Sequence, residues 1–449
     1  MVHRVVRFLW GDISSEDLKK YGILAFVITL ILGNYWMLRV LKDGIFNEFV
    51  GLEWLTRMKP VSVVVATIML LFYSKLVDIF KKHQLFYILC SFYGVLFLFI
   101  GYAISHPDMF SLSVHSSWYP YVSWLPGKLI GWIAYLAIES SNLLMFMFWG
   151  FVASITIPEK AKTVFPMMLF CAQLGTVTST TVANMFVRSI GTATFVFIGG
   201  LIAFIVPCII KWFVTIIPQE EAFVEKRKEK SGFFGGLKLI LTKPYVMGIF
   251  VVSTVYEIVG FFLEFQLKMI GRGFFPSMDS FNAFIAKYGI GVNVLSLLFT
   301  LLGTSFFMRK FGLRFCLMVY PAIIGVVVIT VFSVSIFGIS SLVLMWILWG
   351  SMIALKGFSY ALNNPTKETM YIPTGRDVRF KAKTWIESFG GRGMKAAGGI
   401  IADPFKASLP ALLTFGSIIS FGIVVVWLCV AHLLGTKFNR LQEENKIIE

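Results

Sequence analysis

Apolar runs of about twenty residues recur along the whole chain and constrain its fold more than any other feature. An α-helix needs a run of that length to cross the hydrocarbon core of a bilayer. Only 14% of the residues are charged and 57% are hydrophobic, whereas soluble globular chains carry about 25% charged residues. The sequence therefore predicts an all-α integral membrane protein.

The apolar runs predict twelve transmembrane helices in two pseudo-symmetric halves of six. The expected spans are Tyr21–Leu41, Val61–Phe80, Leu85–Ile104, Leu129–Ile155, Val164–Phe186, Phe195–Ile217, Tyr245–Lys268, Phe281–Phe307, Leu313–Ile336, Leu342–Asn363, Thr384–Asp403 and Leu409–Leu434. The long connection 218–244 is expected to be a cytoplasmic linker between an N-terminal bundle, 1–217, and a C-terminal bundle, 245–449. Its segment Gly235–Leu241 is amphipathic, as expected for a helix on the membrane surface.

The loops after the second and eighth spans are both short and basic, Ser74–Lys82 and Phe307–Arg314. They resemble the inner-loop motif of the major facilitator superfamily. The resemblance implies parallel halves with a substrate site between them near the middle of the membrane.

Lysines and arginines are distributed unevenly between alternate loops. With the N-terminus inside, about 25 of them lie in inner segments and about eight in outer segments. The sequence therefore predicts that both termini are cytoplasmic. The net charge of +16 does not imply nucleic-acid binding, because the cations must first be sorted by membrane side, and we expect no nucleic-acid partner.

Several charged residues fall within or at the ends of the predicted spans, where a charge is costly and often functional. They are Arg39, Lys42, Glu139, Glu257, Glu264, Lys268, Lys356, Glu387, Arg392 and Lys395. Arg39 and Lys42 are three residues apart and share a helix face, as do Glu264 and Lys268 at a spacing of four.

The stretch Asn363–Gly399 is cationic although apolar runs flank it, and it also contains Lys367. Because basic residues outnumber acids in the expected cavity, an anionic ligand would relieve the cost of burying them. Phosphates fit best, since Arg binds them through two hydrogen bonds and Lys as a point charge.

Roles unrelated to ligand binding remain open for several of these charges. Lys42 and Lys268 can extend to the lipid headgroups. Glu139 can form a purely structural ion pair, and Arg392 with Lys395 can simply neutralise Glu387.

Soluble-enzyme motifs are absent from the sequence. The glycines between Gly390 and Gly399 lack the G-K-[ST] sequence and the preceding strand of a phosphate-binding loop, so they indicate close helix packing. We therefore expect no enzyme activity, no catalytic residue, no metal site and no cofactor.

The segment Asn364–Pro373, followed by Lys381-Ala-Lys383 and by Lys395 near Gly398-Gly399, resembles the hallmark stretch of the ATP/ADP translocases. These are nucleotide transporters of intracellular bacteria and plastids. Further matches in the same order are Leu38-Arg39 with Lys42-Asp43, Glu139 with Phe148–Phe151, Ala161-Lys162 with Phe165-Pro166, and Glu264 with Lys268 and Pro276.

The resemblance implies a transporter with twelve spans in a bacterial inner membrane. By motif, the family's functionally important residues fall on Lys42, Glu139, Glu264 and Lys367. The chain departs from the family pattern in having Asn364, Val40, Gln173 and Phe261, and in the additional carboxylate of Glu257.

The combined hypothesis is ATP/ADP exchange by alternating access at a cationic phosphate site. The expected substrate-binding residues are Arg39, Lys42, Glu139, Glu264, Lys268, Lys367, Arg392 and Lys395. Trp36, Tyr135 and Phe261 are candidates to stack on the base. We expect a monomer whose partners are a nucleotide and the lipid bilayer.

Two alternatives belong beside this hypothesis. In a proton-coupled symporter of nucleotides or dinucleotides, protons would be a further partner and Glu257 the candidate coupling residue. In a membrane protein that senses nucleotides without transporting them, the same charges would bind the ligand only.

Overall fold

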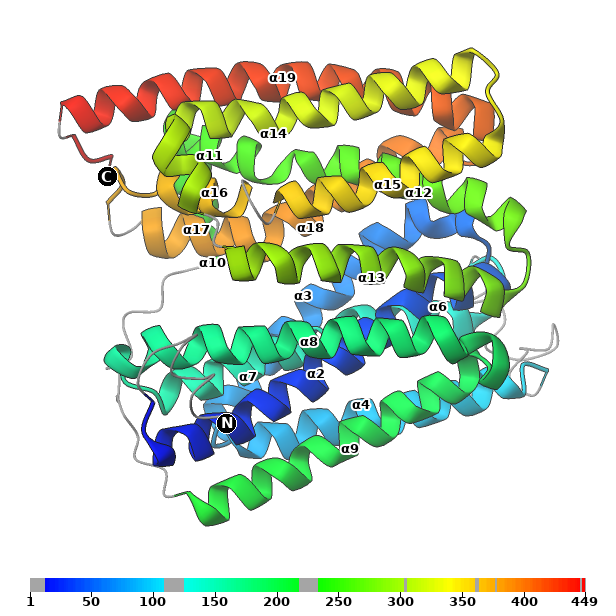
Figure 1. Cartoon of the computed structure of the whole chain (residues 1–449), viewed down its shortest axis with the longest axis vertical. Helices are drawn as coiled ribbons and strands as arrows, with labels where there is room; N and C mark the ends of the chain where they lie inside the picture. The colour runs from blue at the N-terminus through cyan, green and yellow to red at the C-terminus, as the bar shows by residue number, and fades with distance from the viewer. Residues whose placement is uncertain are drawn as a thin grey trace. The chain divides into compact units, whose positions relative to one another are not determined.

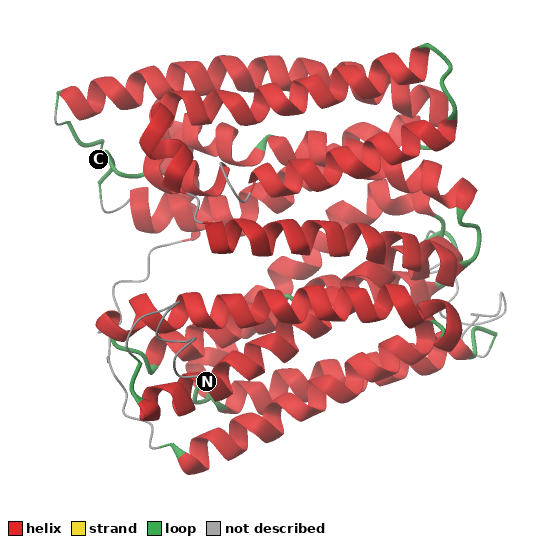
Figure 2. Cartoon of the chain, in the orientation of Figure 1, coloured by secondary structure: helices red, strands yellow, loops and turns green. Residues whose placement is uncertain are grey.

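The computed structural model describes residues 13–108, 125–217, 233–302, 305–359, 363–375, 378–444 and 446–448. Helices account for nearly all of this part of the chain (Figure 2). The β-structure among these residues is a single isolated parallel bridge between Thr374 and Ile448. Helices predominate because a lipid-embedded segment must satisfy its backbone hydrogen bonds internally. The all-α fold predicted for a membrane protein is confirmed.

The chain forms two compact units, which are described separately. Unit 1 takes its described residues from Met1–Leu52, Val64–Arg227 and Phe275–Leu297. Unit 2 takes its described residues from Glu53–Val63, Lys228–Phe274 and Leu298–Glu449. The six-plus-six division of the spans stays a prediction, and the charged part of the linker before residue 233 lies outside the described residues.

Unit 1 is built mainly on two helix pairs (Figure 1). Helix α2 packs against α8, and α4 packs against α9. The helices that contribute to unit 1 are α2 (Ser15–Phe49), α3 (Leu55–Ile79, from Val64), α4 (Gln84–Ser105), α6 (Leu129–Ser140), α7 (Leu143–Ser154), α8 (Pro158–Ile190), α9 (Thr192–Ile216) and α13 (Met278–Leu302, to Leu297). The turn η1 (Leu52–Trp54) precedes α3.

Unit 2 has the long pair α14 and α19 along one edge, and α12 packs against α15, α18 and α19 (Figure 1). The elements of this unit after residue 228 are α10 (Phe233–Thr242), α11 (Pro244–Thr254), α12 (Tyr256–Phe274), α14 (Ser305–Ile336), α15 (Ser341–Phe358), α16 (Asn364–Met370), η3 (Val378–Ala382), α17 (Lys383–Trp385), η4 (Ile386–Gly390), α18 (Gly391–Ala402), η5 (Asp403–Phe405) and α19 (Leu409–Glu443). The segments η3 and η4 are π-helical, a form common at functional sites. Helix α10, which covers the predicted amphipathic segment, packs against η3.

Ten helical segments among the described residues are long and apolar enough to cross a membrane. Two of the twelve predicted spans are not in this group. The predicted span Val164–Phe186 lies in α8, a helix of 33 residues with a low mean hydropathy. The predicted span Thr384–Asp403 is divided among α17, η4 and α18. The number twelve therefore stays a prediction.

Two predicted spans each contain a short turn in the structure. Ser141 and Asn142 lie between α6 and α7, and Val255 lies between α11 and α12. All three residues keep right-handed helical backbone angles, and each pair of helices together is long enough to cross a membrane. At the first turn, the hydroxyls of Ser140 and Ser141 donate to the carbonyls of Ala137 and Ile138. At the second, the Thr254 hydroxyl donates to the carbonyl of Phe250. Such hydrogen bonds back to the preceding turn bend helices.

Glycine allows α2 and α8 to come very close together. A Cβ atom built on Gly175 of α8 would lie 2.7 Å from the carbonyl oxygen of Thr29 in α2. A Cβ atom built on Gly33 of α2 would lie 3.2 Å from the Gly175 carbonyl oxygen. Small residues at such crossings let helix backbones pack tightly in membranes.

We therefore expect Gly175→Ala to destabilise unit 1, because the added methyl group meets backbone atoms that cannot rotate away. The expected loss is about 1–3 kcal/mol, measured as a lower thermal unfolding midpoint of the purified protein in detergent. Gly22→Ala is the matched control, since nothing lies within 4 Å of its Cβ position in α2. Equal midpoints for the two variants would contradict the close approach.

Candidate functional site

The buried Lys42 organises the charges of unit 1. Its side chain is only 5% exposed, and its Nζ lies 3.3 Å from Glu139 Oε2 and 3.4 Å from Asp43 Oδ1. The same ammonium group lies 3.8 Å from the ring centre of Tyr135. Lys42 and Asp43 come from α2, whereas Tyr135 and Glu139 come from α6, so the packing of these two helices assembles the cluster. The alternative in which Lys42 extends to the lipid headgroups is wrong.

Arg39 lies one turn before Lys42 on α2 and is partly exposed. Its guanidinium carbon is 4.7 Å from the ring centre of Trp36, and its Nη1 donates to the Tyr35 hydroxyl at 3.4 Å. We call Arg39, Lys42, Asp43, Tyr135 and Glu139 the unit 1 cluster. Because Glu139 keeps 36% of its side chain exposed, the cluster is accessible from one side.

Glu264 is the corresponding centre of unit 2, where it binds two lysines at once. Its Oε1 accepts from Lys268 Nζ at 2.5 Å, and its Oε2 accepts from Lys395 Nζ at 2.9 Å. Lys268 is on the same helix, α12, whereas Lys395 is contributed by α18. Lys268 is 5% exposed in its side chain, so this residue does not extend to the headgroups either.

Lys59, a residue that the sequence places in an outer loop, also belongs to this group. It is 5% exposed and interacts electrostatically with Glu264. The segment Glu53–Val63 that carries it belongs to unit 2, apart from the rest of α3. Only tertiary packing reveals this neighbour, because helical periodicity says nothing about a residue more than 200 positions away.

Lys367 lies beside Tyr256, with its Nζ 4.5 Å from the ring centre. Burial lowers the pKa of the Lys367 ammonium group from its ordinary value to about 8, and Lys356 adds to this effect while Glu257 opposes it. The Tyr256 ring packs in turn against Tyr320 and Trp427. Lys367, the lysine of the family's hallmark stretch, therefore contacts a cluster of three aromatic rings within unit 2.

Glu257, which follows Tyr256, interacts electrostatically with Lys356, Lys395 and Lys367. We call Lys59, Tyr256, Glu257, Glu264, Lys268, Lys356, Lys367 and Lys395 the unit 2 cluster. Lysines outnumber carboxylates in this group. Burying a cation without full compensation costs several kcal/mol, so an anion that entered this cluster would lower that cost.

The remaining predicted residues of the π-helical region have separate positions. Glu387 lies 3.8 Å from Lys383, which itself pairs with Glu368 at 2.6 Å. The sequence left open that Lys395 neutralises Glu387, but in the structure Lys395 forms its ion pair with Glu264. Arg392 lies on α18 three residues before Lys395 and is partly buried.

The aromatic residues proposed to stack on a base have different environments. Tyr135 is fully buried beneath Lys42, and Phe261 is 2% exposed and stacked on Phe265. These two rings are core residues as the structure stands. Trp36 is partly exposed beside Arg39 and remains a candidate.

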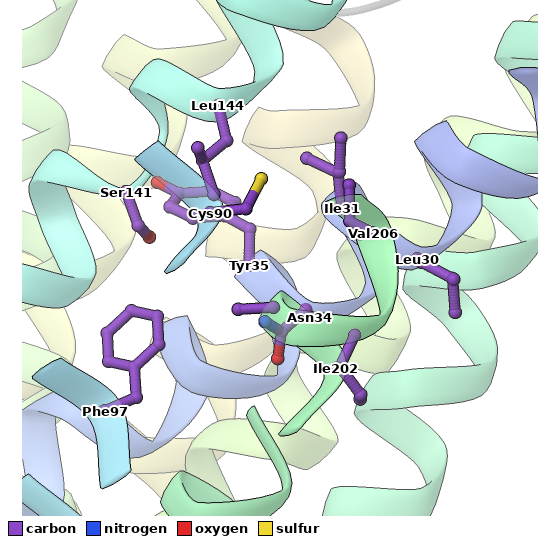
Figure 3. A pocket seen from close by; sticks show the side chains of 11 residues that line it. Leu30, Ile31, Asn34, Tyr35, Cys90, Phe97, Ser141, Leu144, Ile202 and Val206 are labelled. Atoms are coloured by element: carbon purple, nitrogen blue, oxygen red, sulfur yellow. The ribbon is translucent and has the colours of Figure 1, made fainter. Parts of the chain in front are cut away.

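A small cavity in unit 1 lies next to the turn between α6 and α7 (Figure 3). Its polar lining comes from Asn34, Tyr35 and Ser141, with Cys90 and Phe97 beside them. The cavity volume of about 10 Å³ is enough for roughly one water molecule and too small for a nucleobase. The buried Oδ1 of Asn34 accepts no hydrogen bond from the described residues and provides one partner for such a water.

The arrangement of the helices defines the class of protein. It is similar to the nucleoside transporter NupG, with a TM-score of 0.63 at 13% identity over 92% of this chain and 98% of that chain. It is also similar to an inward-facing bacterial homologue of the iron transporter ferroportin, with a TM-score of 0.61 at 13% identity over 93% and 100% of the two chains. The fold is therefore similar to the folds of these two solved membrane transporters.

The sequence comparisons show the family within this class. Residues 2–438 match the family model described as TLC ATP/ADP transporter, and the chain belongs to that family. The chain is 26% identical to ADP,ATP carrier protein 1 of Rickettsia prowazekii (strain Madrid E) over 98% of this chain and 97% of the relative. It is 25% identical to ADP,ATP carrier protein 2, chloroplastic, of Arabidopsis thaliana over 97% and 77%. The predicted family is confirmed.

We expect Glu264→Gln to destabilise unit 2, because it removes the carboxylate that Lys268 and Lys395 share. The expected cost is about 3–5 kcal/mol, as for other buried ion pairs that lose one partner. Thermal unfolding of the purified protein measures the change, and Glu443→Gln at the exposed end of α19 is the control. A midpoint equal to that of the control would show that Glu264 does not hold these lysines.

Proposed function

We propose that the chain is an integral membrane transporter that exchanges ATP for ADP by alternating access. The observation that carries the proposal is the family match over residues 2–438, together with nearly full-length similarity to proteins named ADP,ATP carrier proteins. The surplus of lysines in the unit 2 cluster supports the proposal independently of sequence similarity, because the phosphates of a nucleotide would supply negative charge to these lysines.

In this proposal the phosphates bind to cations that the sequence predicts for the substrate site. The residues are Arg39, Lys42, Lys268, Lys367, Arg392 and Lys395. Arg contributes two parallel hydrogen bonds to a phosphate, and Lys contributes a compact charge. Glu139 and Glu264 hold Lys42, Lys268 and Lys395 in position when no nucleotide is bound.

Exchange then follows from electrostatics. An empty site surrounded by protein keeps uncompensated cations in a medium of low dielectric constant, so its reorientation is slow. A bound nucleotide neutralises those cations and lowers the barrier. The carrier therefore returns faster with a nucleotide than without one, which is the kinetic signature of an exchanger.

The proposed setting is a bacterial inner membrane, with both termini in the cytoplasm and the protein acting as a monomer. The excess of lysine and arginine in alternate loops supports this orientation. The similarity to carriers of Rickettsia supports a bacterial membrane.

Transport of labelled ATP into proteoliposomes tests the proposal. We expect uptake to rise several-fold when the vesicles contain ADP, because loading speeds the return step. We expect Lys367→Glu to abolish uptake, whereas Lys211→Glu, at an exposed position on α9, leaves it unchanged. Equal uptake of ATP and its dephosphorylated counterpart adenosine would contradict the proposal, and so would normal exchange by the Lys367→Glu variant.

The pKa of Lys367 adds a pH-dependent prediction. The ammonium form binds phosphate, and because the pKa is about 8 this form is lost as the pH rises through 8. We expect ATP affinity to fall roughly fivefold to tenfold between pH 7.5 and pH 9. Lys367→Arg should remove this change, since an arginine stays charged throughout the range.

Calorimetry on the purified protein in detergent measures both affinities. The nucleotide phosphates are already largely ionised at pH 7.5, so their own titration contributes little to the expected change. Identical pH profiles for the wild type and the arginine variant would show that another group titrates.

A further inference from the structure

Glu257 lies in a position where one carboxylate faces lysines from three other helical elements. It belongs to the first turn of α12, just after Val255. The lysines that interact with it are Lys356 on α15, Lys367 on α16 and Lys395 on α18. In the sequence, Glu257 stands out as an additional carboxylate and as the candidate coupling residue of a proton symporter, without a predicted ion-pair partner.

The backbone of α18 helps to place the carboxylate. A Cβ atom built on Gly391 would lie 3.8 Å from Glu257 Cγ and 4.0 Å from its Oε1. The carboxylate therefore rests against the first turn of α18, one turn before Lys395. About two turns further along α18 the two helices also pack closely, since a Cβ atom built on Gly398 would lie 3.1 Å from Phe261 Cβ.

Aromatic residues next to Glu257 contact Lys367 and the backbone beside Lys356. Lys367 lies over the ring of Tyr256, the residue directly before Glu257. Tyr256 packs against Tyr320, whose hydroxyl donates to the carbonyl of Leu355 at 3.3 Å. Leu355 directly precedes Lys356, so α12, α14 and α15 are joined beside the carboxylate.

The ion pairs leave this carboxylate with more positive charge than it can neutralise. Lys395 already forms its 2.9 Å ion pair with Glu264. Glu257 acts more strongly on Lys367 than Glu387 does, and it also interacts electrostatically with Lys356. A carboxylate and a phosphate group both accept hydrogen bonds from ammonium groups, so either anion fits among these lysines.

We propose that Glu257 is an internal counter-anion that, in the empty protein, occupies the place of one nucleotide phosphate group, and that Lys356 is a further phosphate-binding residue. This inference rests on the proposed nucleotide transport and adds two residues to its site. On binding, the nucleotide phosphate displaces the carboxylate and takes over the lysines.

Two opposite effects on transport follow from this role. The carboxylate competes with phosphate, so removing its charge should strengthen ATP binding. It also lowers the cost of reorienting the empty site, so removing its charge should make transport depend more strongly on a nucleotide on the opposite side. A residue that only stabilises the fold would produce neither effect.

Glu257→Gln and Lys356→Gln test the proposal, with Glu443→Gln and Lys211→Gln as exposed controls. We expect Glu257→Gln to bind ATP about threefold to tenfold more tightly in calorimetry. In proteoliposomes we expect the ratio of uptake with and without internal ADP to rise at least about threefold, because the empty return is slowed. Glu257→Asp, which keeps the charge, should stay close to the wild type in both measurements.

For Lys356→Gln we expect ATP binding to weaken about tenfold, which corresponds to about 1.4 kcal/mol. Adenosine binding should change less than twofold, because adenosine carries no phosphate for the lysine to contact. Thermal unfolding midpoints are measured for every variant, so that loss of folding is distinguished from loss of contact.

Unchanged or weaker ATP binding by a folded Glu257→Gln variant would overturn the counter-anion role. A second result would also overturn it. If an inward proton gradient stimulated uptake by the wild type but not by Glu257→Gln, the carboxylate would be carrying a proton. In both cases nucleotide transport itself stands. Absence of ATP binding and exchange in the wild type would instead overturn the proposed function, and this inference with it.

Discussion

The cost of holding charge away from water is the constraint on which the rest of this structure depends. Lys42 and Lys268 are each only 5% exposed in their side chains, and each has a carboxylate within ion-pair distance. Glu264 serves two lysines at once, so its loss would leave both without their carboxylate. Sliding or rotating one of these helices against its neighbour would separate the paired charges, so the ion pairs favour a single arrangement of the helices.

Irregular helix geometry occurs next to these same charges. The turn between α6 and α7 follows Glu139, and the turn between α11 and α12 precedes Glu257. In both cases hydroxyl side chains form hydrogen bonds to carbonyls of the preceding turn, whereas the buried hydroxyl of Ser253, beside the second turn, has no hydrogen-bond partner among the described residues. The π-helical segments before α18 are a further irregularity of a kind that is common at functional sites.

The charge balance relates structure to transport. In the unit 2 cluster the lysines outnumber the carboxylates, which favours a polyanionic guest. The carboxylates that are present determine how costly the empty state is. Glu264 fixes the positions of two lysines, whereas Glu257 faces three of them from the start of α12. In the proposed mechanism the same few side chains would therefore couple the affinity for the nucleotide to the rate of empty return.

The sequence by itself determined the fold class, the family and most of the candidate residues. Long apolar runs leave only helices as a solution in lipid, and a charge within such a run is costly enough to stand out. Spacing along one helix predicted the pairing of Glu264 with Lys268. These features are local, so they can be found without knowing which helices are neighbours.

Only the tertiary structure decided which charges meet across helices. It joined Lys42 to Glu139, Lys395 to Glu264 and Lys59 to the same cluster, and it buried Tyr135 and Phe261 in the core. It also showed the short turns between α6 and α7 and between α11 and α12. Hydropathy is an average over many residues, so it does not reveal a local turn within a span. Contacts between distant residues depend on how helices pack, and the periodicity of a single segment does not predict that packing.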